Sequence, residues 1–338
     1  MQVFRALDEL PANYGPTVIA IGNFDGVHCG HRWIIEHTRN RARDLGAKCI
    51  AVTFDPHPVR VLRPDLAPRL ITPMPERLRL LAQTGIDATV VLPFTEEFSH
   101  LPAEAFARDV LRDGLHAVEV HEGDNFRFGY QAQAGIAELK ELGRQLGFTV
   151  ISHPTRTVRG MLASSSKVRE RILAGDMTAA RALLGRPFSI RSTPARGRGI
   201  GTKLTVPTIN LAPYGELLPA NGVYITRMKI GDGPGAPAWN AVTNAGNRPT
   251  FGQESFAVES HLLDFHPPDQ TVNLAEDTPL ELTFLRRLRS EMRFPSPEAL
   301  KAQILRDVAH ALRYFHLAQL ITTAPAKNDL FGRAADRS

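Results

Sequence analysis

The chain has 338 residues, of which 43% are hydrophobic and 22% charged, and its formal net charge is +5. This balance is typical of a globular protein, and no apolar run reaches about 18 residues, so no membrane span is expected. The positive charge suits polyanionic substrates. It also suits nucleic acid, but basic residues are dispersed and aromatic residues make up only 7%, which disfavours a nucleic-acid-binding module.

Residues 1 to about 152 alternate apolar runs with helical patterns. The predicted strands are 17–22, 48–54, 88–92, 116–121 and 148–152. The predicted helices are 31–45, 75–84, 102–113 and 134–146. Such alternation predicts an α/β doubly wound parallel sheet, in which ligands bind beyond the carboxyl ends of the strands. Cys29 and Cys49, the only cysteines, lie near strands of this sheet, so we expect no disulfide framework and a cytoplasmic protein.

Two histidines stand where the first strand turns into a helix, in the stretch GNFDGVHCGH at 22–31. Backbone N–H groups and the helix dipole favour an anion at such a point. The imidazoles of His28 and His31 add hydrogen-bond donors for phosphate oxygens. Gly22 and Gly30 allow the backbone to approach the ligand closely. This arrangement fits the phosphate chain of a nucleotide.

Two further segments follow strands of the same sheet. In TFDPHP, the prolines on either side of His57 fix the backbone and place its side chain at the ligand edge. In GDNFRFG, Asn125 can hydrogen-bond a ligand, while Phe126 and Phe128 can flank a planar ring. Both segments are therefore predicted to contribute to binding.

A cluster of hydroxyls precedes a predicted helix in the segment ASSSKVR. Ser164, Ser165 and Ser166 stand at the helix start, and Arg169 follows one turn later. Together they can form an anion cradle. A simple capping box would explain the serines alone, but the upstream histidine motif favours phosphate binding.

From about residue 185 the strands become short and glycine, proline and threonine become dense. The predicted strands are 188–192, 222–230, 238–244, 256–264 and 279–286. This pattern predicts a small antiparallel β-barrel, followed by a helix for which Ser296 is the N-cap. We therefore expect domains at 1–184 and 185–322, and a frayed tail at 323–338.

The second region begins with a glycine-rich segment that includes Gly199, Gly201 and Thr202. It leads into the segment PTIN, in which Thr208 and Asn210 lie two residues apart and so point to the same side of an extended chain. An oxygen from each side chain could ligate Mg²⁺, a hard cation that needs few protein ligands.

The motifs of the first region resemble the HxGH nucleotidyltransferases, and PTIN resembles the metal-binding element of riboflavin kinases. Both sets occur in the order found in the bacterial bifunctional riboflavin kinase/FAD synthetase family, and the resemblance spans roughly residues 15–315. The resemblance implies two reactions. Riboflavin is phosphorylated by ATP to FMN, and FMN then attacks the α-phosphorus of a second ATP to give FAD and pyrophosphate.

The resemblance also implies roles in adenylyl transfer. His28 and His31 would hold the reacting phosphates, and Ser164 with Arg169 would hold the leaving pyrophosphate with Mg²⁺. Asp25 would fix the loop rather than abstract a proton. The other ATP- or flavin-binding residues implied are Gly22, Phe24, Gly30, His57, Asn125, Phe126, Phe128, Ser165 and Ser166.

For the kinase, the resemblance implies that Glu259 is the general base for the riboflavin 5′-hydroxyl and that Arg289 orders a lid near the flavin. Thr208 and Asn210 would hold Mg²⁺, with Gly199, Gly201 and Thr202 near the nucleotide. The implied partners are riboflavin, FMN, FAD and ATP, without nucleic acid or membrane.

Two alternatives remain open at this point. The family's usual basic residues after Phe128 are replaced by Gln131, Ala132 and Gln133, so the chain could be a kinase with weakened or lost adenylyl transfer. It could also be a flavin- or nucleotide-binding regulatory protein, although the presence of His28 and Glu259 argues against idle sites.

Overall fold

The computed structural model describes two compact units of the chain. The described residues are 1–195, 208–233, 235–250, 253–263 and 274–323. The first unit comprises Met1–Ile190 and Tyr214–Ala220, and the second comprises Arg191–Pro213 and the chain from Asn221 onward. No helix in these ranges has both the length and the apolar character needed to cross a membrane.

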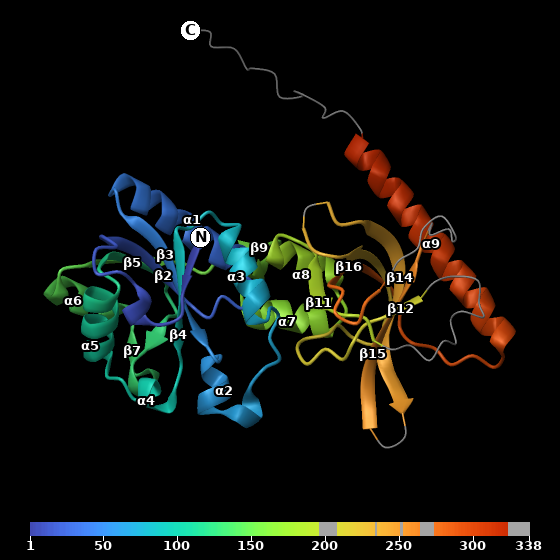
Figure 1. The fold of residues 1–338 in the computed structure, drawn as a ribbon, viewed down its shortest axis with the longest axis horizontal. Coiled ribbons are helices and arrows are strands. Elements are labelled where there is room, and N and C mark those ends of the chain that lie inside the picture. The colour runs from blue at the N-terminus through green and yellow to red at the C-terminus, as the bar shows by residue number, and fades with distance from the viewer. Residues whose placement is uncertain (196–207, 234, 251–252, 264–273, 324–338) are drawn as a thin grey trace, which may run out of the picture. The chain divides into compact units, whose positions relative to one another are not determined.

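The first unit contains a six-stranded sheet in which every neighbouring pair is parallel (Figure 1). In spatial order its strands are β1 (Gln2–Phe4), β4 (Ala88–Pro93), β3 (Lys48–Asp55), β2 (Thr17–Ile21), β5 (Ala117–Gly123) and β8 (Thr149–His153). All five residues of β2 are buried, as expected for a central strand covered on both faces. The predicted doubly wound α/β fold is confirmed.

Helices and short turns connect these strands. They are η1 (Leu7–Glu9), α1 (Cys29–Asp44), α2 (Pro58–Leu62), η2 (Pro64–Leu66), α3 (Met74–Ala82), α4 (Glu96–Ser99), α5 (Ala103–Ala105), η3 (Phe106–Gly114), η4 (Tyr130–Ala132), α6 (Ile136–Leu146), α7 (Ser165–Leu173) and α8 (Met177–Leu184). The predicted helix at 102–113 is a short α5 that continues as the π-helical η3. Leu115 N donates to Val110 O, five residues back, at 2.9 Å.

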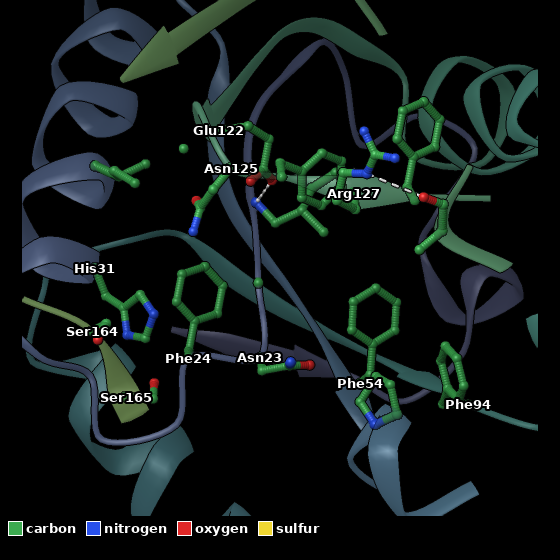
Figure 2. A pocket seen from close by; sticks show the side chains of 18 of the residues that line it. Asn23, Phe24, His31, Phe54, Phe94, Glu122, Asn125, Arg127, Ser164 and Ser165 are labelled. Atoms are coloured by element: carbon green, nitrogen blue, oxygen red, sulfur yellow. Dashed lines mark hydrogen bonds between the residues drawn. The ribbon is translucent and has the colours of Figure 1, made fainter. Parts of the chain in front are cut away.

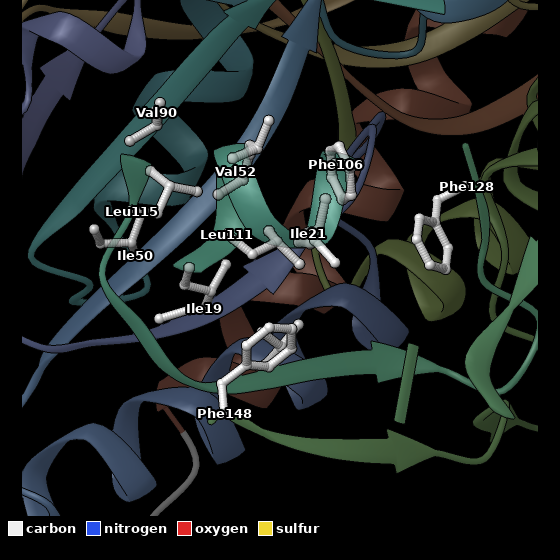
Figure 3. Close-up of a cluster of buried hydrophobic side chains, with 14 of the residues drawn as sticks. Ile19, Ile21, Ile50, Val52, Val90, Phe106, Leu111, Leu115, Phe128 and Phe148 are labelled. Atoms are coloured by element: carbon white, nitrogen blue, oxygen red, sulfur yellow. The ribbon is translucent and has the colours of Figure 1, made fainter. Parts of the chain in front are cut away.

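Two hydrophobic clusters cover the two faces of this sheet. Ile19 and Ile50 belong to the cluster with Leu111 of η3 (Figure 3). Val18 and Ala51 belong to the cluster with α1 and α3. Successive residues of a strand point to opposite faces, so one apolar strand feeds both clusters. Loops follow the strands at their carboxyl ends.

The sequence did not reveal several short strands. β1 is a three-residue edge strand, and two small hairpins join β6 (Arg127–Phe128) to β7 (Ala134–Gly135) and β9 (Thr157–Val158) to β10 (Met161–Leu162). Each strand is too short to carry a readable hydrophobic alternation.

A short segment from later in the chain returns to the first unit. Within Tyr214–Ala220, Glu216 accepts hydrogen bonds from Arg60 Nη2 at 2.6 Å and from Leu70 N at 2.7 Å. Leu217 N also donates to Leu70 O at 3.1 Å. These bonds fix the loop that leads from α2 towards α3.

The second unit is built on an antiparallel sheet. In spatial order its strands are β11 (Phe188–Ser192), β16 (Leu280–Arg289), β13 (Gly222–Ile230), β14 (Ala238–Thr250), β15 (Gln253–Leu262) and β12 (Thr208–Asn210). A bridge between Pro194 and Leu211 joins the two edges, so the sheet curls towards the predicted barrel.

A long C-terminal helix, α9 (Pro297–Thr323), follows this sheet. Ala299 N donates to Ser296 Oγ at 3.2 Å, so Ser296 caps the helix as the sequence indicates. Ala311 and Phe315 of α9 pack against Val223 and Ile225 of β13. Beyond Thr323, the tail predicted for 323–338 lies outside the described residues.

Candidate active sites

The loop after β2 places two stacked imidazoles at the start of α1. His28 is the N-cap, and its Nδ1 accepts hydrogen bonds from Gly30 N at 3.2 Å and His31 N at 3.3 Å. Its ring stacks on that of His31, with centroids 3.6 Å apart. A Cβ at Gly30 would lie 3.0 Å from Ala163 O, so only glycine leaves this packing undisturbed.

Both histidines are neutral near pH 7. Burial lowers the pKa of His28 to about 4, against a smaller opposing effect of Asp25. Burial, reinforced by His28 and Arg77, lowers the pKa of His31 well below its usual range. Because Nδ1 of neutral His28 accepts two N–H groups, its proton must reside on Nε2. The pair therefore offers neutral N–H donors rather than positive charge.

This burial gives a pH prediction. Unfolded histidine titrates near 6.5 but folded His28 near 4, so the unfolded state binds more protons between these values. We expect its contribution to stability to be present above pH about 6.5 and to be lost as the pH falls towards 4. Urea unfolding from pH 7 to 4.5 should show a shallower decline for His28→Asn, which keeps the N-cap, than for the unmodified chain. Equal slopes would contradict this.

The buried Asp25 and the partly buried Arg169 form an ion pair behind the loop. Asp25 Oδ2 accepts from Arg169 Nη2 at 2.8 Å, and the Asp25 carboxylate also accepts from the backbone N–H groups of Ile71 and Thr72 at 3.1 and 2.9 Å. Arg169 Nε donates to Arg69 O at 3.0 Å. Asp25 is thus placed as a loop anchor, whereas Arg169 is not among the residues that line the adjoining cavity.

A cavity of about 1040 Å³ opens beside the histidine loop (Figure 2). Of the residues predicted from the sequence, it is lined by Gly22, Phe24, His28, Gly30, His31, Asn125, Phe126, Phe128, Ser164 and Ser165. Ser166 and His57 do not line it; the Nδ1 of His57 instead accepts from Val59 N at 3.3 Å, as the N-cap of α2.

The serine cluster lies at the start of α7, as predicted. Ser164 Oγ is the N-cap and accepts from Lys167 N at 3.2 Å. Ser165 Oγ donates to Asp25 O at 2.8 Å, which ties α7 to the histidine loop. The capping role and a place in the cavity are therefore compatible. In Figure 2, His31, Ser164 and Ser165 lie on one side of the cavity and Phe54 on the other.

Some cavity residues were not identified from the sequence. Glu122 is 4% exposed at the end of β5, and its carboxyl group accepts from Ile21 N at 2.9 Å (Figure 2). Burial raises its pKa well above the usual range. His153, at the end of β8, also lines the cavity. Polar residues at the carboxyl ends of buried strands were the available signal.

The substituted loop after Phe128 is held by a neighbouring basic residue. Gln131 and Ala132 both have φ near +54°, and Arg127 Nε donates to Ala132 O at 3.1 Å (Figure 2). Arg127 and Gln131 line the cavity. A cationic side chain is thus present beside this loop although its own sequence lacks one.

In the second unit, strand register aligns the predicted kinase residues. Asn210 of β12 lies opposite Glu259 of β15, which lies opposite Asn244 of β14. The row continues through Val223 of β13 to Arg289 of β16. Directly opposed residues share a face, so this row lies on one side of the sheet.

A cavity of about 750 Å³ opens on this face. Its polar lining includes Thr208, Asn244, Glu259, His261, Arg289 and Asp307. Thr208 lies opposite His261, next to the row that holds Glu259, whereas Asn210 is in that row but not in the lining. The predicted nucleotide residues Gly199, Gly201 and Thr202 fall outside the described residues.

Arg289 is fixed by α9. Its Nη2 and Nε donate to Asp307 Oδ2 at 2.8 and 3.0 Å, and Asp307 is 4% exposed. Gln303 Nε2 also donates to Asp307, at 2.9 Å. The guanidinium carbon lies 5.8 Å from the ring centroid of Phe294. Arg289 thus connects the sheet, α9 and the segment that follows β16.

Known proteins match both units. A family model described as FAD synthetase matches residues 10–167, and one described as riboflavin kinase matches residues 184–315. A bifunctional riboflavin kinase/FMN adenylyltransferase of Pseudomonas fluorescens is 36% identical over 312 residues, which cover 92% of this chain and 97% of the relative. Its counterpart in Escherichia coli K12 is 32% identical over 323 residues, covering 94% and 99%.

A solved structure shares the fold. It is described as a macrolide-efflux protein from Streptococcus pneumoniae and is 25% identical, with a TM-score of 0.78 over 90% of this chain and 96% of that one. The curated relatives match nearly end to end at more than 30% identity. The chain therefore belongs to the family of bifunctional riboflavin kinase/FMN adenylyltransferases.

Proposed function

We propose that this chain phosphorylates riboflavin to FMN with ATP, and then transfers an adenylyl group from ATP to FMN, giving FAD and pyrophosphate. The observation that carries the proposal is the order of the two family matches. The FAD synthetase match spans all the residues that line the histidine cavity, and the riboflavin kinase match spans those that line the cavity around Glu259. We further propose that residues 1–184 perform adenylyl transfer and 185–322 the kinase reaction.

The test is a direct assay of both reactions on the full chain. Riboflavin with ATP should give FMN and ADP, and FMN with ATP should give FAD and pyrophosphate. Formation of FMN without formation of FAD would indicate a riboflavin kinase that lacks adenylyltransferase activity. Binding without turnover in either assay would indicate a regulatory protein.

In adenylyl transfer, the FMN phosphate oxygen attacks the α-phosphorus of ATP and pyrophosphate leaves, so no covalent enzyme intermediate is required. Catalysis then consists of positioning and charge stabilisation. The neutral N–H groups of His28 and His31 would hold the reacting phosphates, with Ser164 and Ser165 at the start of α7 close by. Arg169 would act through Asp25, which holds the loop.

In the kinase, Glu259 would accept the proton of the riboflavin 5′-hydroxyl as the γ-phosphoryl group arrives. Its neighbours in the row, Asn210 and Asn244, can orient the carboxylate or the substrate. Asp307 holds Arg289 beside the same cavity. The site thus combines one candidate base with fixed polar groups around it.

The oxygen donors of this face suit Mg²⁺. Thr208 and Asn210 supply neutral side-chain oxygens on one face of β12, opposite His261 and Glu259. They would hold the ion, which would supply positive charge to offset the negative charge of the ATP phosphates. Most other ligands would then be phosphate oxygens and water, as is usual for Mg²⁺.

This assignment gives a metal prediction. We expect Asn210→Ala to weaken the kinase and to move its Mg²⁺ titration to higher concentration, because one oxygen ligand is lost. Asn240→Ala is the matched control, since Asn240 pairs with Arg227 on β13 and does not line the cavity. An unchanged Mg²⁺ titration in Asn210→Ala removes this residue from the metal site.

We infer a reducing compartment for the protein. Cys29 and Cys49 are both free thiols, and burial raises the pKa of Cys49 to about 12. Neither thiol takes part in the proposed chemistry. A chain with only two cysteines, one of them buried, suits the cytoplasmic location that we propose.

A further inference from the structure

A chain of buried hydrogen bonds leads from the surface of the first unit to its cavity. Arg41 Nε and Nη2 donate to the two carboxylate oxygens of Glu119, each at 2.9 Å. Glu119 Oε1 lies 2.7 Å from His121 Nε2, and His121 Nδ1 lies 2.8 Å from His153 Nε2. Glu119, His121 and His153 are 3%, 1% and 6% exposed. The reaction as described above uses none of these four residues.

This chain determines where each proton lies. Hydrogen bonds from Arg41 and His121 outweigh burial and lower the pKa of Glu119, so its carboxylate is ionised and only accepts. Burial lowers the pKa of His121, and lowers that of His153 to about 4, so both rings are neutral near pH 7. His121 must therefore donate from Nε2 and accept at Nδ1.

The same reasoning fixes the tautomer of His153. Its Nε2 must carry the proton that is donated to His121 Nδ1. A neutral imidazole has one proton, so Nδ1 of His153 presents a lone pair. Among the described residues no hydrogen bond to this nitrogen is present, and His153 lines the cavity. His153, one of the residues that line the cavity, is thus a fixed acceptor.

His153 lies at one end of an elongated site. It ends β8, two strands from β2 and therefore about 10 Å to one side of the histidine loop. Phe54 lies at the end of β3 and Phe94 directly follows β4, and both strands are on the other side of β2. Their rings pack against each other in the cavity (Figure 2). The histidine loop thus lies between the aromatic end of the cavity and the end that holds His153.

The two ends differ in chemistry. The phenylalanine end also includes Phe98 and Phe106 and offers a broad apolar surface, which suits the tricyclic ring of a flavin. The other end offers His153 beside Trp33, with the guanidinium carbon of Arg156 5.8 Å from the Trp33 ring centroid. An aromatic surface with a fixed acceptor suits a purine that carries an amino group.

We propose that, within the adenylyl transfer proposed above, His153 reads the base of ATP by accepting a hydrogen bond from its 6-amino group. Glu119 and His121 are positioning residues that hold His153 in the accepting tautomer. A 6-oxo purine would present its own lone pairs to this nitrogen, and both acceptors would remain unpaired. The chain should consequently discriminate ATP from inosine triphosphate.

The test measures pyrophosphate release from FMN by the full chain with ATP, which gives FAD, and with inosine triphosphate, which would give the corresponding hypoxanthine dinucleotide. We expect the unmodified chain to prefer ATP. In His153→Leu, kcat/KM for ATP should fall about tenfold, the loss of one ordinary hydrogen bond, while that for inosine triphosphate changes little. A general structural defect would lower both values together and leave their ratio unchanged.

Two further variants complete the test. His153→Phe keeps a ring against Trp33 but lacks nitrogen, and it should lose the preference in the same way. His37→Leu is the control. The ring centroid of His37 lies 5.3 Å from that of His153, and His37 Nδ1 is hydrogen-bonded to Trp33 O, but His37 does not line the cavity. The melting temperature shows which His153 variant is folded like the unmodified chain. If that variant keeps the unmodified ratio of kcat/KM for ATP to kcat/KM for inosine triphosphate, the proposal is overturned.

Different results would refute adenylyl transfer and the role of His153. If the unmodified chain made no FAD from FMN and ATP, adenylyl transfer itself would be refuted. If it released pyrophosphate equally well from ATP and from inosine triphosphate in the presence of FMN, only the role of His153 would be refuted.

Discussion

We expect the Glu259→Gln variant to lose about 10²–10⁴-fold in kinase kcat, the usual contribution of a general base, while still binding riboflavin and ATP. The amide keeps the size and polarity of the side chain at its place opposite Asn210 and Asn244, but it cannot take the hydroxyl proton. The measurement is FMN formation under saturating substrates. FAD synthesis from supplied FMN should be nearly unchanged.

Glu281→Gln is a suitable control for this variant. Glu281 lies on β16 of the same sheet, pairs with Arg191 at 2.8 Å and does not line the cavity. A near-normal kcat in Glu259→Gln would refute the base assignment. Glu291, which lines the cavity, would then be the next carboxylate to test, together with Asp264, which lies outside the described residues.

The second large effect should come from the histidine pair. We expect the double variant His28→Ala, His31→Ala to make no detectable FAD, whereas riboflavin phosphorylation continues. Loss of a single preorganised donor to developing charge costs about 10²–10³-fold, and here two are removed. Pyrophosphate release from FMN and ATP measures the first activity, and FMN formation measures the second.

The structure separates catalysis from capping at this site. Removing His28 also removes the acceptor for Gly30 N and His31 N, which costs about 1 kcal/mol of stability. His28→Asn keeps a capping oxygen but lacks the Nε2–H donor, so it should melt near the unmodified chain and still lose FAD synthesis. Loss of both activities in a folded double variant would argue against two separate sites.

The sequence predicts local elements of this protein better than it predicts contacts. The five longer strands of the parallel sheet and the serine cap of α7 can be predicted from short stretches of sequence. The pairing of Arg169 with Asp25 is not, because it joins residues far apart in the chain. An arginine near serines is equally compatible with bound phosphate and with a buried carboxylate.

The kinase site shows the same division. That Thr208 and Asn210 share a face follows from strand geometry alone. That Glu259 lies opposite Asn210, and Arg289 two strands further on from Asn244, depends on register across five strands. Register depends on the pairing of whole strands, which no single motif encodes.

The return of Tyr214–Ala220 to the first unit limits how the protein can be divided. A polypeptide that stops at Ile190 would lack Glu216, and the backbone N–H of Leu70 and the guanidinium of Arg60 would lose their acceptors. Because the two units interlace along the chain, no single cut yields both of them whole. An independent adenylyltransferase would have to be spliced, with the seven-residue segment joined back to residues 1–190.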